Sequence, residues 1–252
     1  MNEIIGKLLE HRSIRSYTAQ PVSEEQIRAI VGSAQAASTS SFVQAYTIIG
    51  IKDKARRTRL SELAGNQKHV EDCPLLLIFC LDLHRSELCA AMEGIGPDRT
   101  RDSLESTEQY TVGVVDAALA AQNAAVAAES MGLGICYIGG LRNKPREVAE
   151  LLKTPERVVP LFGMTVGYPA KPSAAKPRLP LEAVYSEETY WTEESEIRGR
   201  LEKYNEVIAE YYRERTGGAR AERWTEQMGN RLAKPNRLDW KDYLASRKLP
   251  LN

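Results

Sequence analysis

The sequence is poor in residue types that would signal disulfide bonds or bound metal. Its 252 residues include only 3 His and 4 Cys, and no two cysteines form a CxxC pair. Cys80 and Cys136 lie in apolar segments, so we predict buried thiols in a reducing cytoplasm. A chain of this size buries enough surface on folding to need neither disulfides nor a structural metal.

Excess charge and long apolar runs are also lacking. The chain has 34 Lys and Arg against 34 Asp and Glu, which argues against broad electrostatic binding to nucleic acid or anionic membranes. No apolar run approaches the roughly 20 residues of a transmembrane helix. Residues 1–15 are amphipathic and do not resemble a signal peptide. We therefore expect a cytoplasmic protein without nucleic acid or membrane partners.

Apolar periodicity predicts helices and strands along most of the chain. The predicted helices cover residues 3–10, 23–36, 54–63, 107–131, 145–152 and 195–213, with a last amphipathic segment around Trp224. The predicted strands cover residues 46–51, 75–81, 135–138 and 158–166. Because residues 75–81 are apolar on both faces, we expect a central strand there. No regular βαβ alternation is visible, so the sequence predicts an α+β fold and not a doubly wound dinucleotide-binding fold.

The composition changes at two places that bear on organisation. The predicted helix 107–131 is rich in alanine, which suits tight packing against another helix in this chain or in a second subunit. After Tyr168, closely spaced prolines predict an irregular segment to Pro180, followed by an extended arm over residues 181–191. We therefore expect a core of residues 1–180 and a C-terminal extension of residues 181–252.

Basic residues gather in three short clusters. They are His11-Arg12-Ser13-Ile14-Arg15, then Lys176-Pro177-Arg178, then Arg213, Arg215, Arg220 and Arg223 around Gly217-Gly218. Guanidinium, ammonium and hydroxyl groups at such spacing can converge on a phosphate, because arginine offers paired donors and serine adds a hydrogen bond. A solvated loop with arginines paired to nearby acids explains the first cluster equally well. A disordered surface loop explains the third equally well.

Other motifs carry less information. Gly132 and Gly134 indicate a helix stop, and Gly139-Gly140 indicates backbone left open for a flat ligand, but the pattern lacks a dinucleotide or P-loop fingerprint. His69 and Cys73 have metal-ligand spacing without a second pair, so zinc is improbable. No hydrolytic nucleophile or zinc-protease motif occurs. Any chemistry is therefore expected to belong to a cofactor.

Taken in order, the motifs resemble those of the oxygen-insensitive NADPH nitroreductase and flavin reductase family, specifically its larger group with a C-terminal extension. The matching segments are HRSIR (11–15), STSSFVQ (38–44), GNQKHV (65–70), VVD (114–116), AQNA (121–124), AESMGLG (128–134), YIGGLRN (137–143), PLFG (160–163) and KPRLP (176–180). The resemblance spans nearly the whole chain. It implies a homodimeric α+β fold that binds FMN, with a central, mainly antiparallel sheet flanked by helices, a C-terminal helical extension, and active sites at the subunit interface.

The resemblance also implies roles for individual residues. His11, Arg12, Ser13 and Arg15 would hold the phosphate and ribityl tail of tightly but non-covalently bound FMN. Lys176 and Arg178 would complete that charge balance or lie near the pyrimidine edge. Thr39, where the family more often has serine, keeps the hydroxyl. Gln67 would hydrogen-bond the flavin ring, and Tyr137, Ile138, Gly139 and Gly140 would run along it. Arg215 and Arg220 would grip the 2′-phosphate of NADPH.

The implied activity is hydride transfer from NADPH to FMN, followed by two-electron transfer to nitroaromatics, quinones or free flavin in ping-pong order. No side chain is expected to be a catalyst in its own right, since the flavin carries the chemistry. Two alternatives stay open at this point. One is a flavin-binding or carrier module with incidental turnover, and the other is a dimerising protein without a cofactor.

Overall fold

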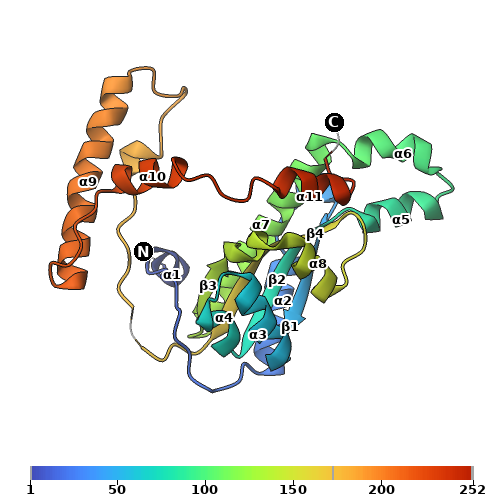
Figure 1. Ribbon diagram of the computed structural model, residues 1–252, viewed down its shortest axis with the longest axis horizontal. Coiled ribbons are helices and arrows are strands. Elements are labelled where there is room, and N and C mark those ends of the chain that lie inside the picture. The colour runs from blue at the N-terminus through green and yellow to red at the C-terminus, as the bar shows by residue number, and fades with distance from the viewer. Residues whose placement is uncertain (1, 172, 251–252) are drawn as a thin grey trace. The chain divides into compact units, whose positions relative to one another are not determined.

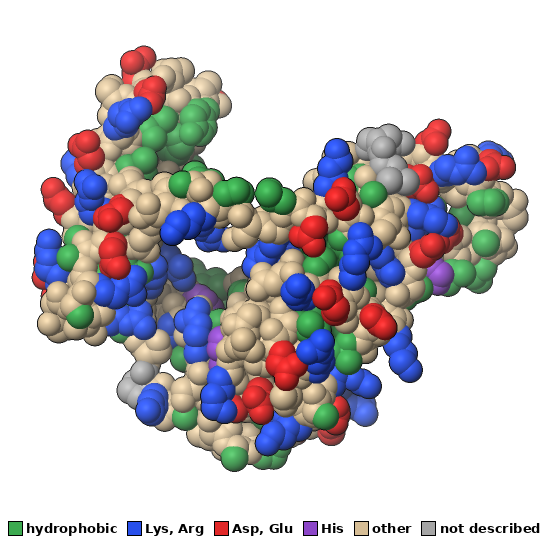
Figure 2. Space-filling model, viewed as in Figure 1, with side chains coloured by type: hydrophobic (Ala, Val, Ile, Leu, Met, Phe, Trp, Pro, Cys, Tyr) green, Lys and Arg blue, Asp and Glu red, His purple; other side chains and the backbone are tan. Residues whose placement is uncertain are grey.

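The computed structural model describes residues 2–171 and 173–250, which form two compact units. The first unit comprises residues up to Ser173 together with the segment from Arg237 onward, and the second comprises Ala174–Asn236. In the first unit, helices cover both faces of a central sheet, which gives three layers (Figure 1). Figure 2 shows basic and acidic side chains interspersed over the visible face of this unit, as the balanced charge would suggest.

The secondary structure of the first unit is mixed, with helices on both sides of one sheet. Its helices are α1 (Glu3–Leu9), α2 (Glu24–Gln35), α3 (Lys54–Leu63), α4 (Lys68–Asp72), α5 (His84–Met92), α6 (Pro97–Leu104), α7 (Thr107–Ser130), α8 (Pro145–Leu152) and α11 (Trp240–Ser246). Its strands are β1 (Tyr46–Ile51), β2 (Leu75–Asp82), β3 (Gly134–Ile138) and β4 (Val158–Gly167), and short 3-10 turns cover Ser40–Phe42 and Gly139–Asn143.

The four strands form one antiparallel sheet in the order β1-β2-β4-β3. This confirms the predicted α+β class and the central position of β2. Alternate β2 side chains face opposite sides: Leu75, Leu77 and Phe79 pack with α2 and α7, whereas the intervening residues pack with α3, α4 and α8. Every β2 residue is buried, which explains why its sequence is apolar from Leu75 to Leu81.

Helix α7 is the main helix of the core. Its alanines Ala121, Ala124 and Ala128 are fully buried against the sheet and against Ile30 and Ala34 of α2, so the expected close packing occurs within this chain. By length and composition this helix is apolar enough to cross a membrane, contrary to the expectation that no segment would be, but half of the relevant window is buried inside the protein. The small side chains raise its hydropathy and also let it pack closely, which identifies it as a core helix.

Several predicted boundaries need correction. The strand at residues 46–51 and the helices at 54–63 and 145–152 have the predicted bounds. The helix predicted to end near residue 213 continues to Thr216. The sequence prediction missed α4, α5, α6 and α11. Helix α5 has no buried residue, so it carries no apolar stripe that periodicity could detect. The expected extended arm begins with a 3-10 turn, Leu181–Ala183.

The second unit is built around α9 (Glu194–Thr216) and α10 (Trp224–Leu232). Its core consists of Tyr204, Ile208 and Tyr212 of α9, with Leu179 and Trp224 packed against them. Asn205 joins the two helices through hydrogen bonds with both the side chain and the backbone N–H of Thr225, at 2.9 and 3.0 Å. The predicted amphipathic segment around Trp224 is therefore a helix.

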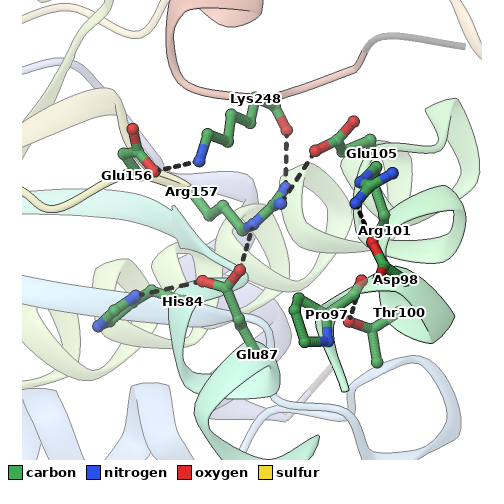
Figure 3. Close-up of polar contacts among 10 residues, drawn as sticks. All are labelled: His84, Glu87, Pro97, Asp98, Thr100, Arg101, Glu105, Glu156, Arg157 and Lys248. Carbon is green, nitrogen blue, oxygen red and sulfur yellow. Dashed lines mark hydrogen bonds and ion pairs between the residues drawn. The ribbon is translucent and has the colours of Figure 1, made fainter. Parts of the chain in front are cut away.

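Arg157 connects distant segments of the first unit (Figure 3). This arginine is 4% exposed. Its guanidinium donates to Glu87 of α5 at 3.1 Å, to Glu105 after α6 at 2.9 Å and to the backbone carbonyl of Lys248 at 3.0 Å. The two carboxylates compensate a charge that would otherwise be very costly to bury. Arg157 thereby ties α5, the end of α6 and the C-terminal segment to the start of β4.

We expect Arg157→Met to lower the free energy of unfolding by about 3–5 kcal/mol, because it leaves Glu105 largely buried without its cation. Urea unfolding of the first unit, followed by circular dichroism, measures this change. The matched control is Arg59→Met, which removes a half-exposed ion pair with Glu62 and should change stability by at most about 1 kcal/mol. Equal losses in the two variants would contradict a structural role for the Arg157 network.

Candidate functional site

The basic turn at residues 11–15 lies along the edge strand β3. Ser13 forms a parallel bridge with Ile135, and the Ile14 N–H donates to the Ile135 carbonyl at 2.8 Å. Ile14 is buried, and a Cβ at Gly134 would lie only 2.4 Å from its side chain. Gly134 is therefore needed for this contact and does not act as the predicted helix stop, which is Gly132 with φ of 76°.

The cations of this turn are only partly matched by acids. His11 contacts Glu129 at 2.7 Å between Nδ1 and Oε1. Arg12 donates instead to the backbone carbonyls of Glu10 and Ser173, at 3.0 and 3.1 Å. Within residues 2–171 and 173–250, neither Arg12 nor Arg15 pairs with a carboxylate. The alternative interpretation of this turn, arginines neutralised by nearby acids, therefore fits His11 alone.

A cavity of about 260 Å³ adjoins the basic turn. Arg12 lines it together with Lys7 and Lys171, and Glu10 and Glu129 lie in the same wall. The backbone of residues 132–134 also reaches it. The cavity therefore combines cationic groups with open backbone next to β3, which suits an anionic ligand.

Arg15 lies where the basic turn, α4 and β3 meet. Its positive charge acts on His69 of α4 and lowers the pKa of the Cys136 thiol, although burial raises that pKa more strongly. Burial first, and then Arg15, lower the pKa of His69 below its ordinary value. The Nε2 atom of His69 is buried and has no hydrogen-bond partner. An orphaned polar atom of this kind calls for a ligand or water to complete it.

Gln67 is held between the end of α3 and the turn after β3. Its side-chain nitrogen donates to the Ala64 carbonyl at 2.7 Å. A Cβ at Gly140 would lie 2.3 Å from that nitrogen and 2.4 Å from the Ala64 oxygen. Gly140 is thus required for packing within the protein. From the sequence, the same glycine was interpreted as backbone left open for a ligand.

The remaining predicted ring contacts lie at the end of β3. Ile138 is buried in the core, whereas Tyr137 is 38% exposed. The Tyr137 ring packs edge-on against Phe162 of β4, with centroids 5.8 Å apart, and its hydroxyl approaches Gln122 of α7 at 3.4 Å. Gly139 begins the following turn and is half-buried. Tyr137 therefore presents an aromatic surface outward beside the two glycines.

The loop at residues 38–45 is strained and anchored by a buried carboxylate. Ser41, Phe42 and Gln44 have φ values of 46°, 59° and 55°, a region that costs non-glycine residues roughly 1–3 kcal/mol each. The fully buried Asp116 of α7 accepts from the backbone N–H groups of Ser40 and Ala45, both at 3.0 Å. This role of Asp116 was not predicted from the sequence, although an acidic residue within an alanine-rich apolar helix indicates a buried carboxylate with a structural partner.

The loop presents polar and aromatic groups together. Thr39 is half-buried and precedes the 3-10 turn, whereas Phe42 is 82% exposed at its tip. Strained backbone of this kind persists only where the surrounding structure holds it in place, and it is concentrated at functional sites. The loop is thus a site candidate on geometry as well as on sequence.

The other four predicted site residues belong to the second unit, which brings them near three tyrosines of α9. Lys176 donates to the Tyr212 hydroxyl at 3.0 Å, and Arg215 donates to the Tyr211 hydroxyl at 2.8 Å. Arg220 lies over the Tyr212 ring, 4.3 Å from its centroid, and Arg178 is close enough to Tyr204 to lower its pKa, against a larger rise from burial. The adjacent tyrosines were not identified as site residues from the sequence.

His69 and Cys73 do not converge on a common point. The Cys73 thiol donates to the Val70 carbonyl at 3.3 Å and is fully buried, and burial raises its pKa to about 12. Residues 2–171 and 173–250 contain no group of three or more His, Cys, Asp and Glu side chains that could hold a metal ion.

Comparison with known proteins finds matches along the whole chain. The model of the nitroreductase family matches residues 8–168, and the model of the C-terminal domain of that family matches residues 176–252. The chain is 50% identical to an FMN reductase (NADPH) of Bacillus subtilis and 42% identical to an oxygen-insensitive NADPH nitroreductase of Salmonella typhimurium, with 97% of each chain covered. The solved structure of B. megaterium NfrA1 matches with a TM-score of 0.96 and 52% identity, over 98% of this chain and 99% of that one.

We expect Asp116→Asn to release the loop at residues 38–45. An amide can accept from one backbone N–H but offers an NH₂ group to the other, so one buried donor loses its partner, at a cost of about 1–3 kcal/mol. Hydrogen exchange at the Ser40 and Ala45 amides measures the release. Asp98→Asn, at an exposed carboxylate, is the control. Unchanged protection of both amides would show that the carboxylate does not hold the loop.

Proposed function

Because the chain belongs to the nitroreductase family, we propose that it is an FMN-dependent oxidoreductase that takes its electrons from NADPH. One observation carries the proposal. Where the basic turn, α4 and β3 meet, Arg15 has no carboxylate partner among the described residues and the buried Nε2 of His69 has no partner at all. A ligand that offers hydrogen-bonding atoms to each would complete both groups.

FMN has the chemistry that these residues require. Its phosphate is an anion that arginine and serine bind well, and its ring edge carries several hydrogen-bonding atoms. The lowered pKa of His69 keeps the imidazole neutral near pH 7, so it can donate or accept without adding charge. The exposed Tyr137 ring and the half-buried Gly139 offer a surface for a flat ring.

We assign the roles accordingly. His11, Arg12, Ser13 and Arg15 are proposed to hold the phosphate and ribityl tail, and Thr39, Gln67, Tyr137, Ile138, Gly139 and Gly140 to contact or shape the ring site. Lys176 and Arg178 are proposed to add to the flavin site, and Arg215 and Arg220 to bind the 2′-phosphate of NADPH. These assignments divide the chain into a flavin-binding core and an extension that serves the coenzyme.

Bound FMN supplies the hydride acceptor and donor, so the protein need not supply a catalytic acid or nucleophile. The contribution of the chain is to position the bound ligand and to polarise it. Arg15 places positive charge at the proposed phosphate and ribityl site without a carboxylate to cancel it, which stabilises the negative charge of a bound ligand. The core behind β3 is largely apolar, which strengthens that interaction.

The proposed electron acceptors are nitroaromatics, quinones and free flavin, used in alternation with NADPH. An exposed aromatic surface and a loop with a projecting Phe42 give a site with an open side, which suits flat acceptors of several kinds. A flavin carrier would bind FMN but would not be reduced by NADPH, so the reduction experiment below separates the two functions.

We also propose a homodimer. Helix α7 exposes Val115 and Leu119 at 46% and 43%, and α1 exposes its apolar residues Ile4 and Leu9 at 63% and 69%. These two helices pack against each other, and we propose that their exposed apolar side chains belong to one dimer interface. A second copy of the chain would bury it, in keeping with a cytoplasmic enzyme that functions as a pair.

The purified protein is expected to be yellow, and NADPH should bleach the flavin absorbance without an added acceptor. Arg15→Ala should weaken flavin binding about ten- to a hundredfold, because it removes a charged hydrogen-bond donor. Release of flavin on dialysis measures the loss. Arg101→Ala, which breaks an exposed ion pair with Asp98, is the control. A colourless wild-type protein that binds no FMN at micromolar concentration would refute the function.

Arg215→Ala should raise the KM for NADPH about ten- to a hundredfold and leave the KM for NADH nearly unchanged, since only NADPH carries the 2′-phosphate. Steady-state rates with both coenzymes measure the effect. Arg213→Ala is a matched control on the same helix, because Arg213 is already paired with Glu210. An equal rise for both coenzymes would place the phosphate contact elsewhere.

A further inference from the structure

The cations of α9 are held in two different ways. Arg198, Arg200 and Arg213 each pair with a glutamate one helical turn earlier on the same helix. At the C-terminal end of α9 the partners change. Arg215 donates to the Tyr211 hydroxyl at 2.8 Å, and Lys176, from the segment before α9, donates to the Tyr212 hydroxyl at 3.0 Å. Within the residues that the structure describes, neither of these two cations pairs with a carboxylate.

The chain after α9 turns back so that a third cation joins them. Gly217 and Gly218 adopt φ values of 59° and 86°, which glycine tolerates without strain. The Thr216 hydroxyl donates to the Tyr212 carbonyl at 2.6 Å and accepts from the Arg220 N–H at 2.9 Å. The turn thereby places the Arg220 guanidinium on the Tyr212 ring.

Tyr212 consequently fixes two cations relative to one another. Lys176 bonds the hydroxyl and Arg220 stacks on the ring, while Gln227 lies within 3.4 Å as the acceptor for the hydroxyl proton. The bond from Lys176 is the main reason why the pKa of Tyr212 lies below its ordinary value. Tyr211 packs edge-on against Tyr212, with centroids 5.4 Å apart, so the two aromatic rings and their three cations form one cluster.

We propose that Tyr211 and Tyr212 are positioning residues that hold Arg215 and Arg220 as a preformed site for the 2′-phosphate of NADPH. Lys176, which is assigned to the flavin site, fixes the Tyr212 ring under Arg220 through its bond to the hydroxyl. This inference rests on the proposed use of NADPH. A phenol orients a cation without cancelling its charge, whereas a carboxylate would neutralise the cation and compete with the phosphate. Preformed donors also spare the entropy of ordering long side chains on binding.

Glu222 is the exception within the cluster. It accepts from the Arg220 Nε with both carboxylate oxygens at 3.1 Å. Its side chain is 39% exposed, and an exposed pair of this kind contributes little stability. Glu222 therefore holds Arg220 only loosely, and the incoming phosphate replaces it on the guanidinium.

The test uses the holoenzyme and two small nucleotides, 2′,5′-ADP and 5′-AMP, which differ by the 2′-phosphate. Calorimetric titration gives the dissociation constant of each. Tyr211→Phe and Tyr212→Phe remove one hydroxyl each and keep the rings. We expect each to weaken 2′,5′-ADP binding about three- to tenfold and 5′-AMP binding less than about twofold. Tyr185→Phe, which removes an exposed hydroxyl of the same unit outside the cluster, should change neither.

Further readouts distinguish positioning from a structural role. Thermal unfolding of the phenylalanine variants should match that of the wild type, since the rings and their packing remain. Ultraviolet titration of tyrosinate should show that Lys176→Ala returns the pKa of Tyr212 toward its ordinary value. Unchanged 2′,5′-ADP affinity in either variant would overturn the role of that tyrosine. Equal losses for both nucleotides would overturn the proposal for the pair.

Failure of this inference differs from failure of the proposed function. A wild-type enzyme that oxidises NADPH in preference to NADH, combined with unaffected phenylalanine variants, leaves the function standing and removes the positioning role. A wild-type protein that neither oxidises NADPH nor binds 2′,5′-ADP removes both.

Discussion

The close contact between Ile14 and Gly134 determines how the basic turn faces its surroundings. With no Cβ at Gly134, Ile14 enters the core and its backbone bonds to Ile135 of β3. Neighbouring side chains of an extended segment point to opposite sides, so the residues on either side of Ile14 point to the side opposite its own side chain. Those residues are Ser13 and Arg15, two of the side chains assigned to the flavin. A buried apolar contact thus sets the direction of the polar groups that bind.

The chain uses two kinds of cation although its net charge is zero. Arg157 is buried and compensated by two glutamates, and its role is structural. Arg15, Lys176 and Arg215 lack carboxylate partners among the described residues, so their fields remain available to an anionic ligand. Overall composition argues against broad electrostatic binding, but it could not reveal which individual cations stay unpaired. That property depends on where the acids fold.

Local patterns predicted the sheet and most of its helices because burial there is regular. β2 is apolar on both faces since it lies inside the sheet, and the capping box at Ser23 and Gln26 begins α2 as expected. Helix α11 escaped prediction because its residues are ordered by contacts with distant ones, such as the bond from Arg146 to Ser246. The same limit applies to Asp116, whose partners Ser40 and Ala45 lie far away along the chain.

His69 shows how the structure identifies a candidate ligand-binding residue that its spacing did not indicate. Cys73 follows four residues later, a spacing found in zinc sites, but the sequence offers no second pair of ligands and zinc binding was not predicted. The structure turns the Cys73 thiol to the Val70 carbonyl and leaves the buried Nε2 of His69 unpartnered. Arg15 nearby disfavours protonation of the imidazole. A ligand that satisfies this corner must therefore offer an acceptor to Arg15 and a hydrogen-bonding atom to a neutral imidazole. FMN supplies both groups, an acceptor from its phosphate and ribityl tail and a hydrogen-bonding atom from its ring edge, whereas a simple metal cation would be repelled by Arg15.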